Sequence, residues 1–114
     1  MEMDCVFCKI AAGEIPSTKI FEDGQALAFY DASPQAPVHF LVIPKNHIGS
    51  AQEIDDGNSA QIAHIFEVIA RIARQLDLDN GYRVVTNVGD DGGQTVGHLH
   101  FHVLAKRKLA WPPG

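Results

Sequence analysis

The sequence has no run of 18 apolar residues, so it offers no segment that could cross a membrane as a single helix. It contains only two cysteines in 114 residues, too few for a fold held by several disulfides. Basic residues are also scarce: nine Lys and Arg against 14 Asp and Glu give a net charge of −5. Such a chain lacks the positive field that binds nucleic-acid polymers. We therefore expect neither a membrane nor a nucleic-acid polymer as a partner.

The first ten residues, MEMDCVFCKI, are acidic at the start and contain only a short apolar stretch, unlike a secretory signal. We therefore expect a cytoplasmic protein with reduced cysteines. Cys5 and Cys8 have the CxxC spacing, which indicates metal or redox chemistry in a reducing compartment. With 46% hydrophobic and 20% charged residues, the chain is expected to form one globular domain over residues 1–114.

The first half of the chain predicts one short helix and three strands. Apolar residues at helical spacing predict a helix within 5–13, which Gly13 and the following proline end. Strand-like runs at 18–22 and 26–30 flank Asp23 and Gly24, whose tolerance of positive φ predicts a tight hairpin. The almost wholly apolar run at 38–43 predicts a buried strand.

The second half predicts a long helix and two more strands. Apolar residues recur at helical intervals from 62 to 76, and Asn58 with Gln61 resembles a capping box at the helix start. Strands are expected at 82–87 and 98–105. This order of elements predicts an α+β domain on a mostly antiparallel sheet, with the helices covering one face.

The stretch HLHFH places three of the six histidines at alternate positions. In a strand, His98, His100 and His102 would share one face and their apolar neighbours the other. The outer two Cα atoms would be about 13 Å apart, so one tetrahedral zinc ion cannot bind all three. Two of them could share an ion only with a ligand from elsewhere. The other chemistry is a neutral imidazole that attacks a phosphoryl group while its neighbours stabilise the charge.

A glycine-rich loop, VGDDGGQTVG, precedes these histidines. Its adjacent glycines would let backbone N–H groups approach a phosphate, and Gln94 and Thr95 add side-chain donors. Such a loop is also common simply as a turn, and the aspartates at 90 and 91 are expected on the solvent side. His39 is expected to be a hydrogen-bonded core residue unless its strand lies beside the histidine strand.

Together, GHLHFHVL, PVHFLVIPKNH, DGGQTVG and WPPG resemble the histidine triad (HIT) family, most closely its Hint-like branch of purine nucleoside phosphoramidases. The resemblance extends from CVFCKI to Gly114. It implies a HIT-like fold with a five-stranded antiparallel sheet, one long and one short helix, and a homodimer whose sheets join. It also implies cleavage of P–N bonds in AMP or GMP conjugates, with release of the nucleoside monophosphate and no cofactor in catalysis.

The same resemblance implies roles for individual residues. His100 would attack the α-phosphorus and form a nucleotidyl-histidine intermediate, and the other catalytic residues would be His102, His39, Thr95 and Gln94. The ribose would bind Asp31, and the base would lie between apolar side chains. The whole nucleotide-binding set would be Phe7, Ile10, Phe29, Asp31, Ala32, Asn87, Gln94, Thr95, His100 and His102. The WPPG end would reach toward the partner subunit's site, where Trp111 would shape the preference for the leaving group.

Many bacterial-type relatives hold a structural zinc through a CxxC pair and two histidines, and the matching residues here are Cys5, Cys8, His47 and His98. A closed Cys₂His₂ site leaves no open position for catalysis. A redox-active cysteine pair and two reduced thiols beside a packed helix are the alternatives.

Three alternative functions stay open from the sequence. The first is a dinucleoside polyphosphate hydrolase of the same family, which the short chain disfavours because that branch has long substrate-bridging loops. The second is a purine-nucleotide-binding regulatory module with little turnover. The third is a zinc-dependent structural protein, which would leave His100 and His102 without a role.

Overall fold

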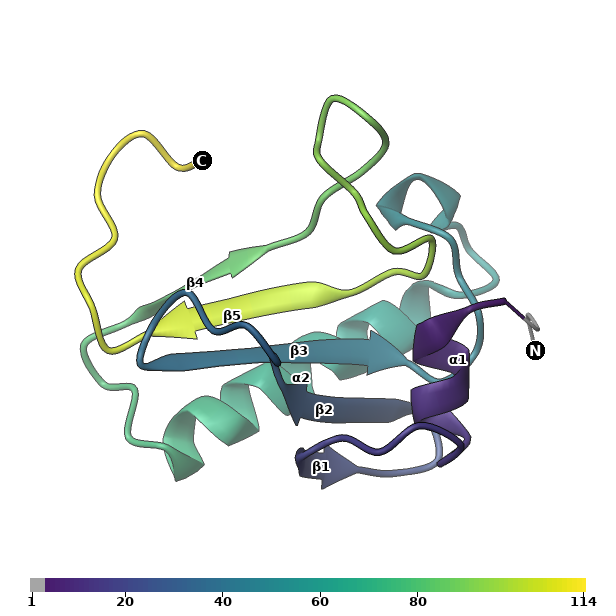
Figure 1. The fold of residues 1–114 in the computed structure, drawn as a ribbon, viewed down its shortest axis with the longest axis horizontal. Coiled ribbons are helices and arrows are strands. Elements are labelled where there is room, and N and C mark those ends of the chain that lie inside the picture. The colour runs from purple at the N-terminus through teal and green to yellow at the C-terminus, as the bar shows by residue number, and fades with distance from the viewer. Residues whose placement is uncertain (1–3) are drawn as a thin grey trace.

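A five-stranded sheet with one helix on each face organises the chain (Figure 1). The structure, a computed structural model, describes residues 4–114. Within them, no helix is both long and apolar enough to span a membrane. In chain order the elements are α1 (Val6–Ala11), β1 (Lys19–Glu22), β2 (Ala26–Tyr30), β3 (Val38–Pro44), the 3₁₀ helix η1 (Ala51–Glu53), α2 (Ser59–Gln75), β4 (Tyr82–Val85) and β5 (Phe101–Ala105).

The strands are arranged in the order β1-β2-β3-β5-β4, and all neighbouring pairs are antiparallel. The expected α+β architecture, with a five-stranded antiparallel sheet, one long helix and one short helix, is confirmed. The connection through α2 is what allows β5 to lie between β3 and β4. As a result, the histidine strand lies inside the sheet, between β3 and β4.

Alternate residues of the central strands pack against different helices. Ala28 and Val42 belong to the core beneath α2, whereas Leu27 and Leu41 belong to a second cluster that includes the apolar side of α1. In Figure 1, α2 passes behind the sheet and α1 lies in front of it. The expectation that the helices share one face was therefore wrong. Because β2 and β3 are apolar on both sides, each face needs its own cover.

One of the two predicted turn details differs from the structure. Gly13 has a φ of 81° after α1, as expected, but Gly24 is not among the residues with positive φ. The hairpin instead depends on Asp23, whose Oδ1 accepts the Gln25 and Ala26 N–H groups, each at 2.8 Å. A side-chain acceptor that satisfies the turn's backbone donors removes the need for a left-handed residue.

The predicted capping box at the start of α2 was also wrong. The Asn58 side chain makes no capping bond to the helix. Its Oδ1 accepts the Asp55 N–H at 2.8 Å and its Nδ2 donates to the Glu53 carbonyl at 3.0 Å. The amide therefore closes the loop before the helix, a local alternative open to asparagine.

The last two strands are shorter than predicted, since β4 ends at Val85 and β5 begins only at Phe101.

Candidate functional site

The pairing of β3 with β5 brings His39 beside His102. Leu41 lies opposite His102 and His39 lies opposite Leu104, so the two histidines are diagonal neighbours on one face. Their ring nitrogens, Nε2 of His39 and Nδ1 of His102, are 2.9 Å apart. The strand that carries His39 therefore lies beside the histidine strand. This was the condition for His39 to have a functional role instead of a purely structural one in the core.

The hydrogen bond between these rings has a defined direction. The Gln35 N–H donates to His39 Nδ1 at 3.0 Å, so that nitrogen carries no proton. In a neutral imidazole the proton then lies on Nε2, which donates to His102 Nδ1. His102 therefore keeps its own proton on Nε2. Burial lowers the pKa of His102, and the nearby His100 and His39 lower it further. Asp31 raises this pKa but does not outweigh the other effects, so the ring is neutral at pH 7.

His100 is held in the opposite tautomer. Its Nδ1 lies 2.7 Å from the His98 carbonyl oxygen, which can only accept, so Nδ1 carries the proton and donates it. The lone pair of the neutral ring is then on Nε2. Phe7 of α1 packs edge-on against this ring with 5.1 Å between centroids, and only 5% of His100 is exposed. The residue therefore presents a ring of fixed orientation whose Nε2 lone pair can act as the nucleophile.

His100 and His102 line a cavity of about 510 Å³ between α1, the end of β2 and the loop before β5. A cavity of that size accommodates a nucleotide-sized ligand. Nine of the ten residues expected to bind nucleotide lie in its wall: Phe7, Ile10, Phe29, Asp31, Ala32, Asn87, Thr95, His100 and His102. The fold thus assembles one concave site from segments that are far apart in the sequence.

Six further residues line this cavity and were not anticipated: Pro16, Ser17, Thr18, Tyr30, Leu41 and Val96. Of these, Ser17 has an unpaired hydroxyl that only the tertiary structure reveals. Its Oγ is buried and is the one such side-chain atom in residues 4–114 that lacks a hydrogen-bond partner. A buried hydroxyl without a partner is uncommon, and in the wall of a cavity it is a potential ligand contact.

Asp31 lies where the cavity meets the His39–His102 pair. One carboxylate oxygen accepts the Ser33 N–H at 2.7 Å. The other is 3.5 Å from His39 Nε2 and 3.9 Å from His102 Nδ1. The carboxylate is thus anchored by backbone on one side and faces the histidine pair on the other.

The glycine-rich loop is closed by its own hydrogen bonds. The Gly93 N–H donates to the Asp90 carbonyl and the Gln94 N–H donates to the Gly89 carbonyl, both at 3.0 Å. These N–H groups are therefore not free to bind an anion. The sequence had instead predicted that the Gly93 N–H would approach a phosphate. A Cβ on Gly92 would clash with the Val88 carbonyl oxygen, so only glycine fits there. The two aspartates at 90 and 91 are exposed, as predicted.

Gln94 does not line the cavity. Its Oε1 accepts the Gly89 N–H at 3.0 Å, and its Nε2 donates to the carbonyls of Gly49 and Val96 at 2.8 and 3.0 Å. The side chain therefore ties the loop to itself and to the segment after β3. In this structure its polar groups are used within the protein rather than presented to a ligand.

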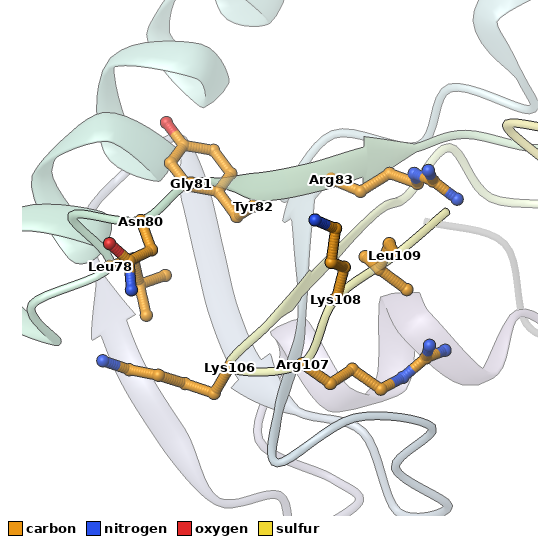
Figure 2. Close-up of a pocket in the computed structure, with 9 residues that line it drawn as sticks. All are labelled: Leu78, Asn80, Gly81, Tyr82, Arg83, Lys106, Arg107, Lys108 and Leu109. Carbon is orange, nitrogen blue, oxygen red and sulfur yellow. The ribbon is translucent and has the colours of Figure 1, made fainter. Parts of the chain in front are cut away.

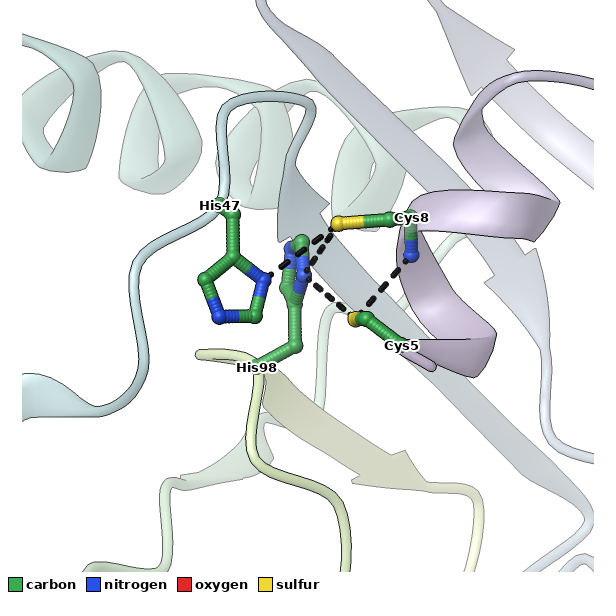
Figure 3. Close-up of side chains that lie close together, drawn as sticks. All are labelled: Cys5, Cys8, His47 and His98. Carbon is green, nitrogen blue, oxygen red and sulfur yellow. Dashed lines mark hydrogen bonds between the residues drawn. The ribbon is translucent and has the colours of Figure 1, made fainter. Parts of the chain in front are cut away.

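His98, the first histidine of the triad, lies in a separate cluster with Cys5, Cys8 and His47 (Figure 3). The four potential ligand atoms lie within 4.8 Å of one another. His98 Nδ1 is 3.2 Å from Cys5 Sγ and 3.5 Å from Cys8 Sγ, and His47 Nδ1 is 3.3 Å from Cys8 Sγ. Bonds of about 2.3 Å to sulfur and 2.0 to 2.1 Å to nitrogen place S and N about 3.6 Å apart around tetrahedral zinc. The donor set and spacing therefore fit such an ion.

The surroundings of His98 favour metal binding through Nδ1. Its Nε2 is 2.9 Å from the Pro44 carbonyl, so Nε2 donates and Nδ1 keeps its lone pair. Burial lowers the pKa of His98 by more than the hydrogen bond to Pro44 raises it. The ring is therefore neutral at pH 7. His98 and His102 thus belong to different clusters, which excludes an ion shared between them.

Comparison with known proteins gives one family. The family model described as HIT domain matches residues 12–109. An uncharacterized HIT-like protein of Synechococcus elongatus is 49% identical over the full length of both chains. Among solved structures, a histidine triad protein from Clostridium difficile has a TM-score of 0.93 and 52% identity, with 96% of each chain covered. A HIT family hydrolase from Legionella pneumophila has a TM-score of 0.95 and 48% identity, covering 97% of this chain and all of its own.

Replacement of Gln94 tests its structural role. We expect Gln94→Met to lower the free energy of unfolding by roughly 1 to 3 kcal/mol, because three backbone groups lose their partner. Urea denaturation measures the change. Gln52→Met, at an exposed position of η1, is the matched control and should stay within about 0.5 kcal/mol of the unaltered protein. An equally small change for Gln94→Met would contradict the structural role.

Proposed function

Because the chain belongs to the HIT domain family, we propose that it hydrolyses purine nucleoside 5′-phosphoramidates through a nucleotidyl intermediate on His100. The observation that carries this proposal is the hydrogen bond from His100 Nδ1 to the His98 carbonyl, which leaves a lone pair on Nε2 in the cavity wall. The similar Legionella pneumophila protein is described as a hydrolase, which supports the reaction class.

The proposed reaction has two displacement steps at phosphorus. In the first, the His100 Nε2 lone pair forms a bond to the α-phosphorus while the P–N bond to the amine breaks, and the amine leaves with a proton. In the second, water attacks the same phosphorus, the P–N bond to His100 breaks, and the nucleoside monophosphate departs. A neutral imidazole suits both steps, since it is a nucleophile as the free ring and a leaving group once attached to phosphorus.

The neighbouring residues have separate proposed tasks. The N–H donor on His102, with Asn87 and Thr95, would stabilise the charge on the phosphoryl oxygens. His39, which is hydrogen-bonded to His102, would take part in moving the proton to the amine. Asp31 would accept hydrogen bonds from the ribose hydroxyls. Phe7 and Phe29, whose rings meet edge to face at 5.7 Å, would pack against the base together with Ile10.

A covalent adduct on His100 is the sharpest test of the reaction. With an AMP–amine conjugate, we expect rapid quenching and mass spectrometry to detect a transient adenylyl group on His100, followed by AMP. His100→Ala should lose the adduct and release AMP at least about 10³-fold more slowly, because no nucleophile remains.

His64→Gln is the matched control, because His64 of α2 pairs with Asp23 of the β1–β2 turn and does not line the cavity. It should keep both adduct and turnover. AMP release by His100→Ala at the unaltered rate, or an adduct on another residue, would refute the mechanism. Binding of AMP without turnover in the unaltered protein would instead favour a nucleotide-binding module, and faster cleavage of diadenosine tetraphosphate would favour the polyphosphate hydrolase.

We also propose that Cys5, Cys8, His47 and His98 hold a structural zinc ion. Tetrahedral spacing and the hydrogen bond that orients His98 support this, and the Cys8 N–H donates to Cys5 Sγ at 3.2 Å, which holds that sulfur in place. When bound, the ion would join α1 to the segments before β5 and after β3. Cys5 and His47 also line a cavity of about 330 Å³, which offers a path for metal entry.

Metal analysis of the purified protein tests the zinc site. We expect about one zinc ion per chain, and we expect Cys5→Ala to lose it. The variant should melt about 5 °C or more below the unaltered protein, because bound metal stabilises only the folded state. Absence of zinc from both proteins would overturn the proposal and leave the redox pair or free thiols.

We further propose that two copies form a homodimer along β4. In the described part of the chain β4 is an edge strand, and edge strands carry unpaired backbone groups that readily pair with another chain. The adjoining surface is apolar: Tyr82 and Phe66 are 40% and 45% exposed, and Phe66 packs on Phe101 of the neighbouring strand at 5.2 Å. A second copy would cover this strip.

Light scattering tests the assembly. We expect a particle of twice the 12.4-kDa chain mass, and Phe66→Glu should shift it to the monomer because a carboxylate would be buried in the interface. Val6→Glu, which alters a hydrophobic residue of similar exposure on α1, should leave the dimer intact. A monomeric unaltered protein would refute the proposal.

A further inference from the structure

The pairing of β4 with β5 ends before it reaches the proposed nucleophile. The first pair of this ladder is Tyr82 opposite Ala105, and the last is Val85 opposite His102. Because β5 begins only at Phe101, His100 lies outside the regular strand. Within residues 4–114, none of the backbone–backbone hydrogen bonds outside the helices and strands involves His100. Its main chain therefore needs another partner to be fixed in place.

The two ends of this strand pair differ in their surroundings. Where β4 begins, the wall of a cavity of about 690 Å³ includes Arg83 and the basic residues at 106–108 (Figure 2). The proposed homodimer along β4 would place this end against the second copy. The other end of β4 leads through Thr86 and Asn87 to the histidine cavity, whose wall includes Asn87 but not Thr86.

Thr86, the first residue after β4, supplies a hydrogen bond where the ladder stops. Its hydroxyl Oγ1 donates to the His100 carbonyl oxygen at 2.9 Å. A carbonyl oxygen has no proton to give, so the direction of this bond is fixed. The Thr86 side chain therefore joins the end of β4 to the main chain of the proposed nucleophile, as a ladder bond joins two paired strands.

The hydroxyl is the part of Thr86 that the local backbone does not require. The two residues before it are Val84 and Val85, and valine has the branched shape of threonine without the polar group. Burial of a hydroxyl costs free energy unless it is hydrogen-bonded. Thr86 is half-buried, and its bond to His100 meets this requirement. The hydroxyl thus adds a link to His100 that a valine at this position would lack.

His100 is held at three points. Its Nδ1 donates to the His98 carbonyl at 2.7 Å, and Phe7 packs on its ring with 5.1 Å between centroids. These two contacts fix the orientation of the ring. The Thr86 hydroxyl fixes the main chain from which the ring extends. All three determine where Nε2 lies, because a shift of the main chain moves the whole side chain with it.

Thr86 is also the neighbour in sequence of Asn87, a proposed donor to the phosphoryl oxygens. One residue thus links the attacking group to a group that stabilises charge. In-line attack needs the nitrogen about 3 to 3.5 Å from the phosphorus, and a misplacement of about 1 Å can cost roughly 10²-fold in rate. A residue that sets this distance affects the rate of reaction more than the affinity for the nucleotide.

We propose that Thr86 is a positioning residue, whose hydroxyl holds the His100 main chain so that Nε2 meets the α-phosphorus in line. This role rests on the proposed phosphoramidase function. Because Thr86 does not line the histidine cavity, it acts through His100 and does not contact the substrate. Loss of the hydroxyl slows formation of the nucleotidyl intermediate and leaves nucleotide affinity unchanged.

Two variants separate the hydroxyl from the shape of the side chain. Thr86→Val removes the hydroxyl and keeps the branched shape, whereas Thr86→Ser keeps the hydroxyl. In a single-turnover rapid quench with an AMP–amine conjugate, we expect Thr86→Val to form the His100 adduct at least about tenfold more slowly, because the nucleophile is misplaced. Its dissociation constant for AMP, measured by calorimetry, should change by less than about twofold. Thr86→Ser should restore adduct formation to within about threefold of the unaltered rate.

Ser50→Ala is the matched control. Ser50 Oγ accepts the Gln52 N–H at 3.2 Å, so this variant also loses one hydroxyl bond to the backbone, outside the histidine cavity. Ser50→Ala and Thr86→Val should each melt roughly 5 °C lower, because each loses one hydrogen bond. Ser50→Ala should nevertheless form the adduct at the unaltered rate. Equal losses of rate in the two variants would assign the effect to general stability and overturn the proposal.

Three other results would overturn the role of Thr86. They are an unchanged adduct rate in Thr86→Val, no recovery in Thr86→Ser, and a loss of AMP affinity large enough to account for the slower reaction.

Failure of the proposed function is recognised separately, because the unaltered protein then forms no adduct and releases no AMP. In that case the nitrogen NMR signals of the His100 ring decide whether Thr86 holds this residue. They should shift in Thr86→Val and stay in place in Ser50→Ala. Unchanged signals in Thr86→Val would show that the hydroxyl does not position the ring.

Discussion

The hydrogen bond from His100 Nδ1 to the His98 carbonyl is the constraint on which the histidine site depends. A neutral imidazole has one proton to place, and this carbonyl decides that the proton lies on Nδ1. The His98 ring is fixed in turn by the Pro44 carbonyl and by the two cysteines. One residue thus connects the cysteine cluster, through its side chain, to the proposed nucleophile, through its backbone.

The two clusters at the ends of the triad follow from packing against the sheet. Leu99, Phe101 and Val103 are anchored in the core beneath α2, which turns the three histidines to the face that α1 covers. Phe7 of α1 contacts both His98 and His100, so the short helix is a wall of the site as well as a cover for the sheet. Because apolar burial holds the alternation, it persists at His98 and His100 even before β5 begins.

Charge is distributed unevenly over this acidic chain. The carboxylate that matters at the histidine cavity, Asp31, is anchored by a backbone N–H and faces the His39–His102 pair. At the other end of β5, cations gather around a separate cavity and are oriented by carbonyls alone. In both places, neutral backbone groups position charged side chains without neutralising their charge.

The sequence alone determined the architecture and most of the histidine cavity. The alternation around HLHFH and the helical period after residue 58 predict which side chains are buried, because they follow from the order of the apolar residues. The sequence did not reveal that the helices lie on opposite faces of the sheet. Nor did it reveal the Asp23 turn, the loop closed by Asn58 or the hydrogen bonds of the Gln94 side chain within the protein. Those depend on which polar groups meet after folding. Nor could it show that Arg83 joins the basic run at 106–108, because that juxtaposition exists only when β4 and β5 pair. Local periodicity records what must be buried, whereas hydrogen-bond partners and charge clusters between distant segments are decided only by the tertiary structure.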